Sequence, residues 1–300
     1  MTADTSHHSV SGNLRLAFFL NLGFTVLEIV GGLWTNSLAI LADAVHDLGD
    51  SLALGMAWYF EKYSQRAGDR LFSYGYRRFS LLGAVISAAV LITGSLFILS
   101  EVIPRLLQPE PAHAPGMILF AVVGVTVNGL AVLRLRGHHG LNARIVAWHL
   151  LEDVLGWLAV LVVGILFLFR PVYILDPILS GLITLYVLFN VVKSLRKALN
   201  IFLQAVPEGM SIDDLERSFR RLPHVRSTHH THVWSLDGER HVLSTHVVVD
   251  AAISKEQIVI LKQGIREIIR DLDIQHSTVE IEFGDEPCRI SETIRRHVSP

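Results

Sequence analysis

Six long apolar segments constrain this chain more than any other feature of its sequence. Each reaches the roughly 20 residues that a helix needs to cross a hydrocarbon core about 30 Å thick. They are residues 14–34, 38–60, 79–101, 115–135, 141–168 and 172–193. Only 18% of the chain is charged, against about 25% in a typical soluble protein. The sequence therefore predicts an α-helical membrane protein with six transmembrane helices.

The last hundred residues differ in composition and read as a soluble domain. The expected elements are a helix at 211–221, strands at 229–236 and 241–249, a helix at 254–270 and a strand at 277–283. This α-β-β-α-β order predicts a small cytoplasmic α+β domain that resembles a ferredoxin-like fold. The expected divisions are a cytoplasmic tail 1–13, a transmembrane domain 14–206, a cytoplasmic domain 207–285 and a tail 286–300.

Lysine and arginine fall mostly on one side of the predicted spans. That side carries Arg15, Lys62, Arg66, Arg70, Arg77, Arg78, Arg134, Arg136, Arg144, Lys193, Arg196 and Lys197, whereas the other carries only Arg105 and Arg170. Because basic loops stay in the cytoplasm, both termini are expected there. Short loops favour the bacterial inner membrane as the location.

Two His/Asp pairs lie inside these apolar segments. His46 and Asp50 lie in the second segment, and His149 and Asp153 lie in the fifth. Residues four apart share one face of a helix. Counted from the segment ends, both pairs lie roughly 12–18 Å deep, near the bilayer centre. If the two helices pack together, two imidazoles and two carboxylates form a tetrahedral site that suits zinc before other metals.

Other acidic residues accompany the pairs at a cost, because a charge at the bilayer centre costs about 2.5–3.5 kcal/mol on insertion scales. Asp43 shares a face with His46, so it is expected to orient a ligand or to line the ion path. Asp47 and Glu152 point about 100° away from the ligands and are weaker candidates. Glu28 is isolated and is expected to make an interhelical hydrogen bond. The alternative for the quartet is a purely structural role, as a polar network that only fixes helix packing.

Composition excludes several other functions. Cys288 is the only cysteine, which rules out an intramolecular disulfide framework and a cysteine-based metal site. A net charge of −2 argues against binding to nucleic acid.

Several motifs together resemble the cation diffusion facilitator family. They are residues 37–50 (SLAILADAVHDLGD), 70–78 (RLFSYGYRR), the His149/Asp153 pair, 229–236 (HHTHVWSL) and 243–247 (LSTHV). The resemblance covers most of residues 14–283. It implies a homodimeric metal/proton antiporter, not an enzyme, that exports a divalent cation across the bilayer. Two His and two Asp resemble the zinc-selective members.

The resemblance also implies metal ligands in the cytoplasmic domain. His229, His246 and Glu282 align with regulatory zinc ligands, and His276 is a further candidate. Strand alternation places His232 and Trp234 on one face and His229 on the other. Some members hold zinc in the loop after the second span, but residues 61–78 contain Asp69 and no His. His138 and His139 are expected to form a solvated turn.

Ligand chemistry suggests the coupling mechanism. His and Asp must lose protons before they bind a metal, so zinc and protons compete for one site. His46 or His149 is expected to carry the exchanged proton. Two other classes remain open: a membrane metalloenzyme, which the lack of an open coordination position and of an HExxH motif disfavours, and a membrane-anchored zinc sensor that signals through the cytoplasmic domain.

Overall fold

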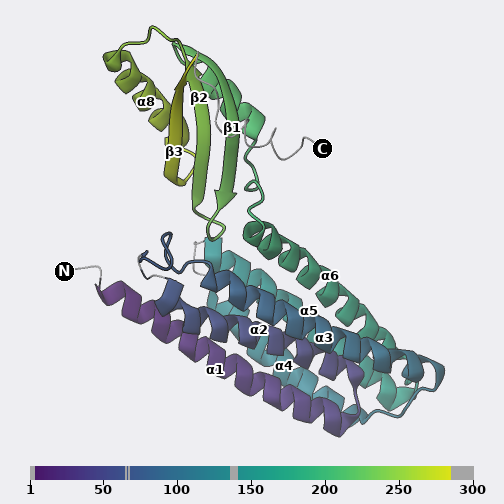
Figure 1. Ribbon diagram of the computed structural model, residues 1–300. Coiled ribbons are helices and arrows are strands. Elements are labelled where there is room, and N and C mark those ends of the chain that lie inside the picture. The colour runs from purple at the N-terminus through teal and green to yellow at the C-terminus, as the bar shows by residue number, and fades with distance from the viewer. Residues whose placement is uncertain (1–3, 65, 67, 136–140, 285–300) are drawn as a thin grey trace. The chain divides into compact units, whose positions relative to one another are not determined.

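The computed structural model describes residues 4–64, 66, 68–135 and 141–284, which fall into two compact units (Figure 1). The first unit spans Met1–Gln65 and Leu82–Arg196, and the second spans Arg66–Leu81 and Lys197–Pro300. The predicted turn at His138 and His139 and the tail 286–300 lie outside the described residues.

Long helices build the first unit. They are α1 (Asp4–Thr35), α2 (Leu38–Ser64), α3 (Phe79–Leu107), α4 (Ala114–Leu135), α5 (Leu141–Phe169) and α6 (Leu175–Phe202). Among the described residues, α1, α3, α4, α5 and α6 are long and apolar enough to cross a membrane. The sequence predicted six spans. By composition α2 falls outside this group, because its 27 residues include the acidic and His side chains of the candidate site.

The first helix begins at Asp4, whereas the sequence predicted a tail up to residue 13. Once the apolar part of α1 is helical, each added residue gains a hydrogen bond without a new nucleation cost. The polar residues that precede Arg15 therefore continue the helix.

Asp176 fixes the start of α2. Its carboxylate accepts hydrogen bonds from the backbone N–H of Leu38 (2.7 Å) and Ala39 (3.3 Å) and from the Ser37 hydroxyl (2.5 Å). Asp176 is buried in the first turn of α6. A carboxylate at a helix N-terminus satisfies free N–H groups and opposes the helix dipole. Asn36, in the left-handed region at φ 54°, completes the tight turn from α1.

Trp157 of α5 anchors the packing of α4 against α5. Its side chain is buried and lies over Gly124, where an added Cβ would be 2.3 Å from the indole ring. Only glycine permits this approach. The surrounding core contains Met117 and Ala121 of α4 and Val160 of α5, so α5 is held by close packing near its candidate ligands.

The second unit contains a three-stranded sheet with helices on one face. Its elements are α7 (Ile212–Arg220), β1 (Val225–Ser235), β2 (His241–Val249), α8 (Lys255–Arg270) and β3 (Ile274–Phe283). The strand order is β1-β2-β3, with β1 antiparallel and β3 parallel to β2. This matches the predicted α-β-β-α-β order. Phe219, Leu243, Val247, Leu261 and Ile265 form the core between the sheet and the helices.

A bulge in β1 changes which side chains share a face. His229 pairs with His246, but the next pair joins His232 to Ser244, so β1 has one residue more than β2 there. His230 lies in the left-handed region at φ 50°. Because Ser244 and His246 point to one face of β2, His229 and His232 share that face too. The prediction that they point to opposite faces was wrong, since it assumed a regular strand.

Candidate metal centres

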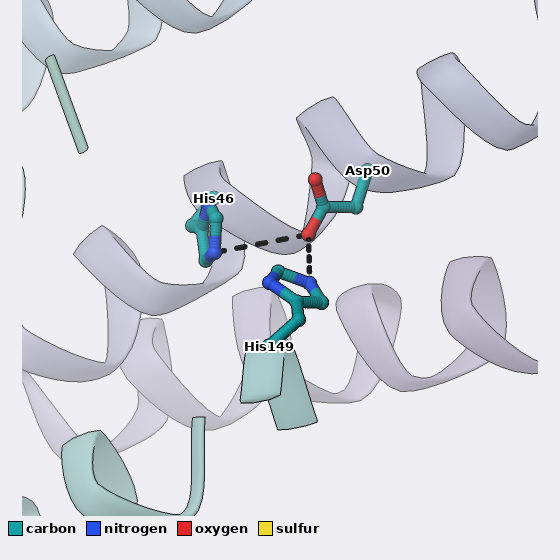
Figure 2. Close-up of side chains that lie close together, drawn as sticks. All are labelled: His46, Asp50 and His149. Atoms are coloured by element: carbon teal, nitrogen blue, oxygen red, sulfur yellow. Dashed lines mark hydrogen bonds and ion pairs between the residues drawn. The ribbon is translucent and has the colours of Figure 1, made fainter. Parts of the chain in front are cut away.

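The structure brings the His/Asp pairs of α2 and α5 together. Oδ2 of Asp50 lies 2.8 Å from Nε2 of His149 and 3.7 Å from Nε2 of His46. Figure 2 shows the Asp50 carboxylate beside the two imidazole rings, with His46 and Asp50 on one helix and His149 on another. The helical spacing that the sequence suggested is therefore realised in space.

Asp153 completes the group. Its carboxylate oxygens lie 3.9 Å from Nε2 of His46 and 4.0 Å from Nε2 of His149. Zinc bonds of 2.0–2.2 Å place tetrahedral donor atoms about 3.3 Å apart. The distances of 2.8–4.0 Å in this quartet bracket that value. Donor atoms of His46, Asp50 and His149 lie within 4.8 Å of one another, so these three can hold one ion as they stand, and Asp153 has to move closer to supply the fourth donor.

Two cavities adjoin the quartet. One of about 390 Å³ is lined by His46, Asp50 and His149. Another of about 260 Å³ is lined by Asp43, His46 and Asp153. His46 lines both cavities, and Asp43 lines the second.

A separate polar stripe of α2 faces α1. The Asn21 amide donates to the carbonyl of Asp47 and to the hydroxyl of Ser51, both at 3.0 Å. Glu28 of α1 is 1% exposed, and its carboxyl group faces that of Asp47 on α2. Asp47 is therefore the candidate partner for the interhelical hydrogen bond predicted for Glu28, which stays a prediction. Glu152 lines both cavities beside the quartet and accepts a hydrogen bond from Tyr186 at 3.0 Å.

The second unit holds a different cluster on the face of the sheet opposite α8. Oε2 of Glu282 lies 3.0 Å from Nε2 of His229, and Oε1 lies 2.6 Å from Nδ1 of His246. One donor atom from each side chain falls within 4.8 Å of the others. Two imidazoles and a carboxylate from three strands can hold a divalent metal.

The structure does not bring His276 into this cluster. His276 pairs with Val242, whereas Glu282 pairs with Val248. Six residues of strand separate these positions by about 20 Å. The His276 ring instead contacts Tyr74, with centroids 5.4 Å apart. His276 alternates onto the correct face but lies at the wrong end of β3.

His230 joins the cluster, although no pattern in the sequence singles it out. Its ring centroid lies 5.2 Å from that of His229 and 5.4 Å from that of His246. Desolvation and the nearby His229 and His246 lower the pKa of His230, which favours its neutral, metal-binding form. The bulge places it there, and no periodicity in the sequence predicts a bulge. Glu280 also lies near, 3.4 Å from Nε2 of His246.

Comparisons with known proteins match both units. A model of the cation efflux transmembrane domain matches residues 14–203, and one of the cation efflux protein cytoplasmic domain matches residues 207–283. The chain is 32% identical to the zinc transporter ZitB of Pectobacterium atrosepticum, over 95% of this chain and 92% of that protein. It is also 32% identical to the metal cation efflux system protein CzcD of Cupriavidus metallidurans, over 96% and 92%.

A third relative is the cadmium, cobalt and zinc/H(+)-K(+) antiporter of Bacillus subtilis, 30% identical over 90% of this chain and 88% of that protein. The first family model alone covers more than half of the 300 residues, and it includes all four members of the quartet. The chain is a multi-pass membrane protein that belongs to the cation diffusion facilitator family.

Proposed function

We propose that this protein exports zinc from the cytoplasm by exchanging it for protons at the quartet of His46, Asp50, His149 and Asp153. The convergence of these donors from α2 and α5 carries the proposal. Two nitrogens and two oxygens that converge beside these cavities suit zinc geometrically and chemically. The three relatives are named as zinc or metal cation transporters.

We infer that α2 is a sixth span despite its polarity. It is 27 residues long, enough for a bilayer. Its Asp43 and Asp47 are buried within the unit and face protein, as intramembrane charges usually do. Six spans keep both termini on the basic, cytoplasmic side. By analogy with its bacterial relatives, the protein resides in the bacterial inner membrane.

Coupling follows from competition for the same atoms. The Asp50–His149 contact at 2.8 Å requires a proton between its atoms, and zinc must displace that proton to bind both groups. Loading zinc on the cytoplasmic side releases protons there, and protons that return from outside release zinc. Asp43 lines the cavity on the ion path. Alternating access to the midplane site completes the cycle.

We further propose that the protein is a homodimer whose cytoplasmic domain senses zinc. His229, His246 and Glu282 supply three ligands, and His230 or Glu280 supplies a fourth. Zinc there acts as a regulatory ion rather than as cargo. Binding at this cluster couples to transport if zinc favours one arrangement of the dimer over another.

Zinc uptake into proteoliposomes with an imposed pH gradient tests the function. Wild type is compared with Asp50→Ala and with Glu101→Ala, which removes an exposed carboxylate of α3. We expect gradient-driven uptake in wild type and Glu101→Ala and none in Asp50→Ala. Uptake that survives Asp50→Ala would discard this site but keep the transporter. No uptake by the folded wild-type protein would refute the transport function.

A zinc sensor is the second candidate, and the cytoplasmic cluster is the observation that favours it. A sensor needs zinc binding in the second unit but no ion passage through the first. Under that function, His46→Ala and Asp153→Ala leave the zinc tolerance of expressing cells unchanged. Under the transport function, both variants lose that tolerance.

A further inference from the structure

The second unit includes a cavity that plays no part in zinc chemistry. It has a volume of about 260 Å³ and is lined by Ser73, Tyr74, Arg77, Arg78, Gln204 and Trp234, among others. We propose that this cavity binds the phosphate group of an anionic phospholipid. The proposal does not depend on the ion that the protein transports.

Asp69 fixes the loop that carries the arginines. Its carboxylate accepts hydrogen bonds from the backbone N–H of Leu71 (2.8 Å) and Phe72 (2.7 Å) and from the Tyr76 hydroxyl (2.7 Å). These bonds lower the pKa of Asp69, the backbone bond of Phe72 most of all. The carboxylate therefore stays charged, and the turn stays formed, until the pH falls below the ordinary Asp range. The hydrogen bonds of Asp69 therefore fix the conformation of the loop that carries Arg77 and Arg78.

The charge of the cavity suits an anion. Its lining includes Arg77 and Arg78 and no acidic residue. Nη1 of Arg77 lies 3.5 Å from the carboxylate of Asp237, which neutralises it in part. Nε of Arg78 is buried and has no hydrogen-bond partner among the described residues. A buried donor without a partner is costly, and a phosphate oxygen would satisfy it with a charge-assisted hydrogen bond.

The surroundings favour a lipid over a free anion. Leu71 is 79% exposed and Leu203 is 78% exposed, although both are apolar. Leu71 lies eight residues before Phe79, which begins α3, and Leu203 directly follows Phe202, which ends α6. Exposed apolar side chains this near the ends of membrane helices can contact acyl chains, and the indole of Trp234 adds an apolar wall to the basic cavity. Basic pockets on the cytoplasmic side commonly hold anionic headgroups.

Lipid binding by the purified full-length protein in detergent tests the proposal. Dissociation constants are measured for phosphatidylglycerol, phosphatidylcholine and inorganic phosphate, each for wild type and three variants. Arg78→Gln removes the charge, Arg78→Lys keeps it, and Arg196→Gln removes an exposed charge of α6 outside the cavity. Removing one charged hydrogen-bond donor should weaken phosphatidylglycerol binding about tenfold.

We expect wild type, Arg78→Lys and Arg196→Gln to prefer phosphatidylglycerol over phosphatidylcholine, and Arg78→Gln to lose that preference. Equal affinity of wild type for the two lipids would overturn the proposal. An equal loss of phosphatidylglycerol affinity in Arg78→Gln and Arg196→Gln would also overturn it, because it would indicate only a general attraction between basic residues and anions. Inorganic phosphate binding as tightly as phosphatidylglycerol would show a free-anion site and overturn the lipid assignment. Because Arg78→Lys preserves the charge, its binding separates loss of the site from misfolding.

Discussion

The two clusters of candidate metal-ligand side chains differ in how they are built and in how closely their donor atoms lie. The quartet joins two regular helices, and its nitrogen–oxygen distances run from 2.8 to 4.0 Å. The cytoplasmic cluster joins three strands, and Glu282 lies 3.0 Å from His229 and 2.6 Å from His246. Each cluster contains both buried and half-exposed side chains: Asp153 is 10% and His149 40% exposed in the first, and Glu282 is 9% and His229 32% exposed in the second. Under the proposed roles, a transported ion that must be released needs loosely placed donors, whereas a regulatory ion is better held by closely paired donors.

Removing one imidazole from each cluster tests most directly whether the two clusters have separate roles. His149→Ala should lower the rate of zinc transport at least about 100-fold, since a direct ligand matters more than the outer partners whose loss costs 10–100-fold. His246→Ala should leave basal transport within about twofold and abolish its stimulation by cytoplasmic zinc. Zinc flux in proteoliposomes measures both effects. Equal losses in the two variants would show that the clusters do not have separate roles.

Acid should weaken zinc binding at the quartet. Both imidazoles and both carboxylates must be free of protons at the atoms that bind the ion, so zinc and protons compete for the same donors. The affinity should therefore be highest at pH 8 and fall as the pH decreases to 6, by about tenfold or more. Titration of a variant without His229 and His246 isolates the quartet. An affinity that stays constant between pH 6 and 8 would contradict proton competition at this site.

The bulge in β1 can be tested by substitutions at His230. Its φ of 50° costs a side chain roughly 1–2 kcal/mol, and a β-branched residue more. His230→Gly should stabilise the second unit by about 1 kcal/mol, and His230→Val should destabilise it. Thermal unfolding of the full-length protein measures both. The matched controls are His232→Gly and His232→Val, because His232 lies in regular pairing. If glycine were also more stabilising than valine at His232, the backbone at His230 would not be special.

An effect of similar size on stability, with none on transport, is expected from the cap of α8. Ser254 and Gln257 form a capping box at its N-terminus. Ser254→Ala should destabilise the second unit by about 1 kcal/mol without changing the initial transport rate. Thermal unfolding and zinc flux on one preparation check this. A large loss of transport would mean that transport at the quartet depends on small changes in the stability of the second unit.

The contrast between the clusters also explains what the sequence could predict. Helical spacing is strict, so each His/Asp pair could be placed on one face of its own helix from the sequence alone, whereas the approach of the two helices is seen only in the structure. The order of elements in the second unit was also predictable, because the periodicity of apolar residues distinguishes helices from strands. The composition of α2 places it outside the apolar group because it carries Asp43, His46, Asp47 and Asp50.

Strand faces were harder to predict because a single extra residue reverses the alternation. The bulge at His230 put His229 on the face of His232 and added an imidazole that the sequence did not single out. His276 shows a different limit. It lies on the correct face of β3, but only the register with β2 reveals that it is remote from Glu282. Register depends on tertiary pairing, which spacing along one strand does not contain.

The most direct test of the central claim is X-ray absorption spectroscopy at the zinc edge. The sample is full-length protein that carries His229→Ala and His246→Ala and is loaded with one zinc ion at pH 8. We predict two imidazole nitrogens and two carboxylate oxygens at about 2.0–2.2 Å. Adding Asp50→Ala should abolish stoichiometric binding. A coordination sphere without two imidazoles, or an unchanged spectrum after Asp50→Ala, would contradict the assignment of the transported ion to this quartet.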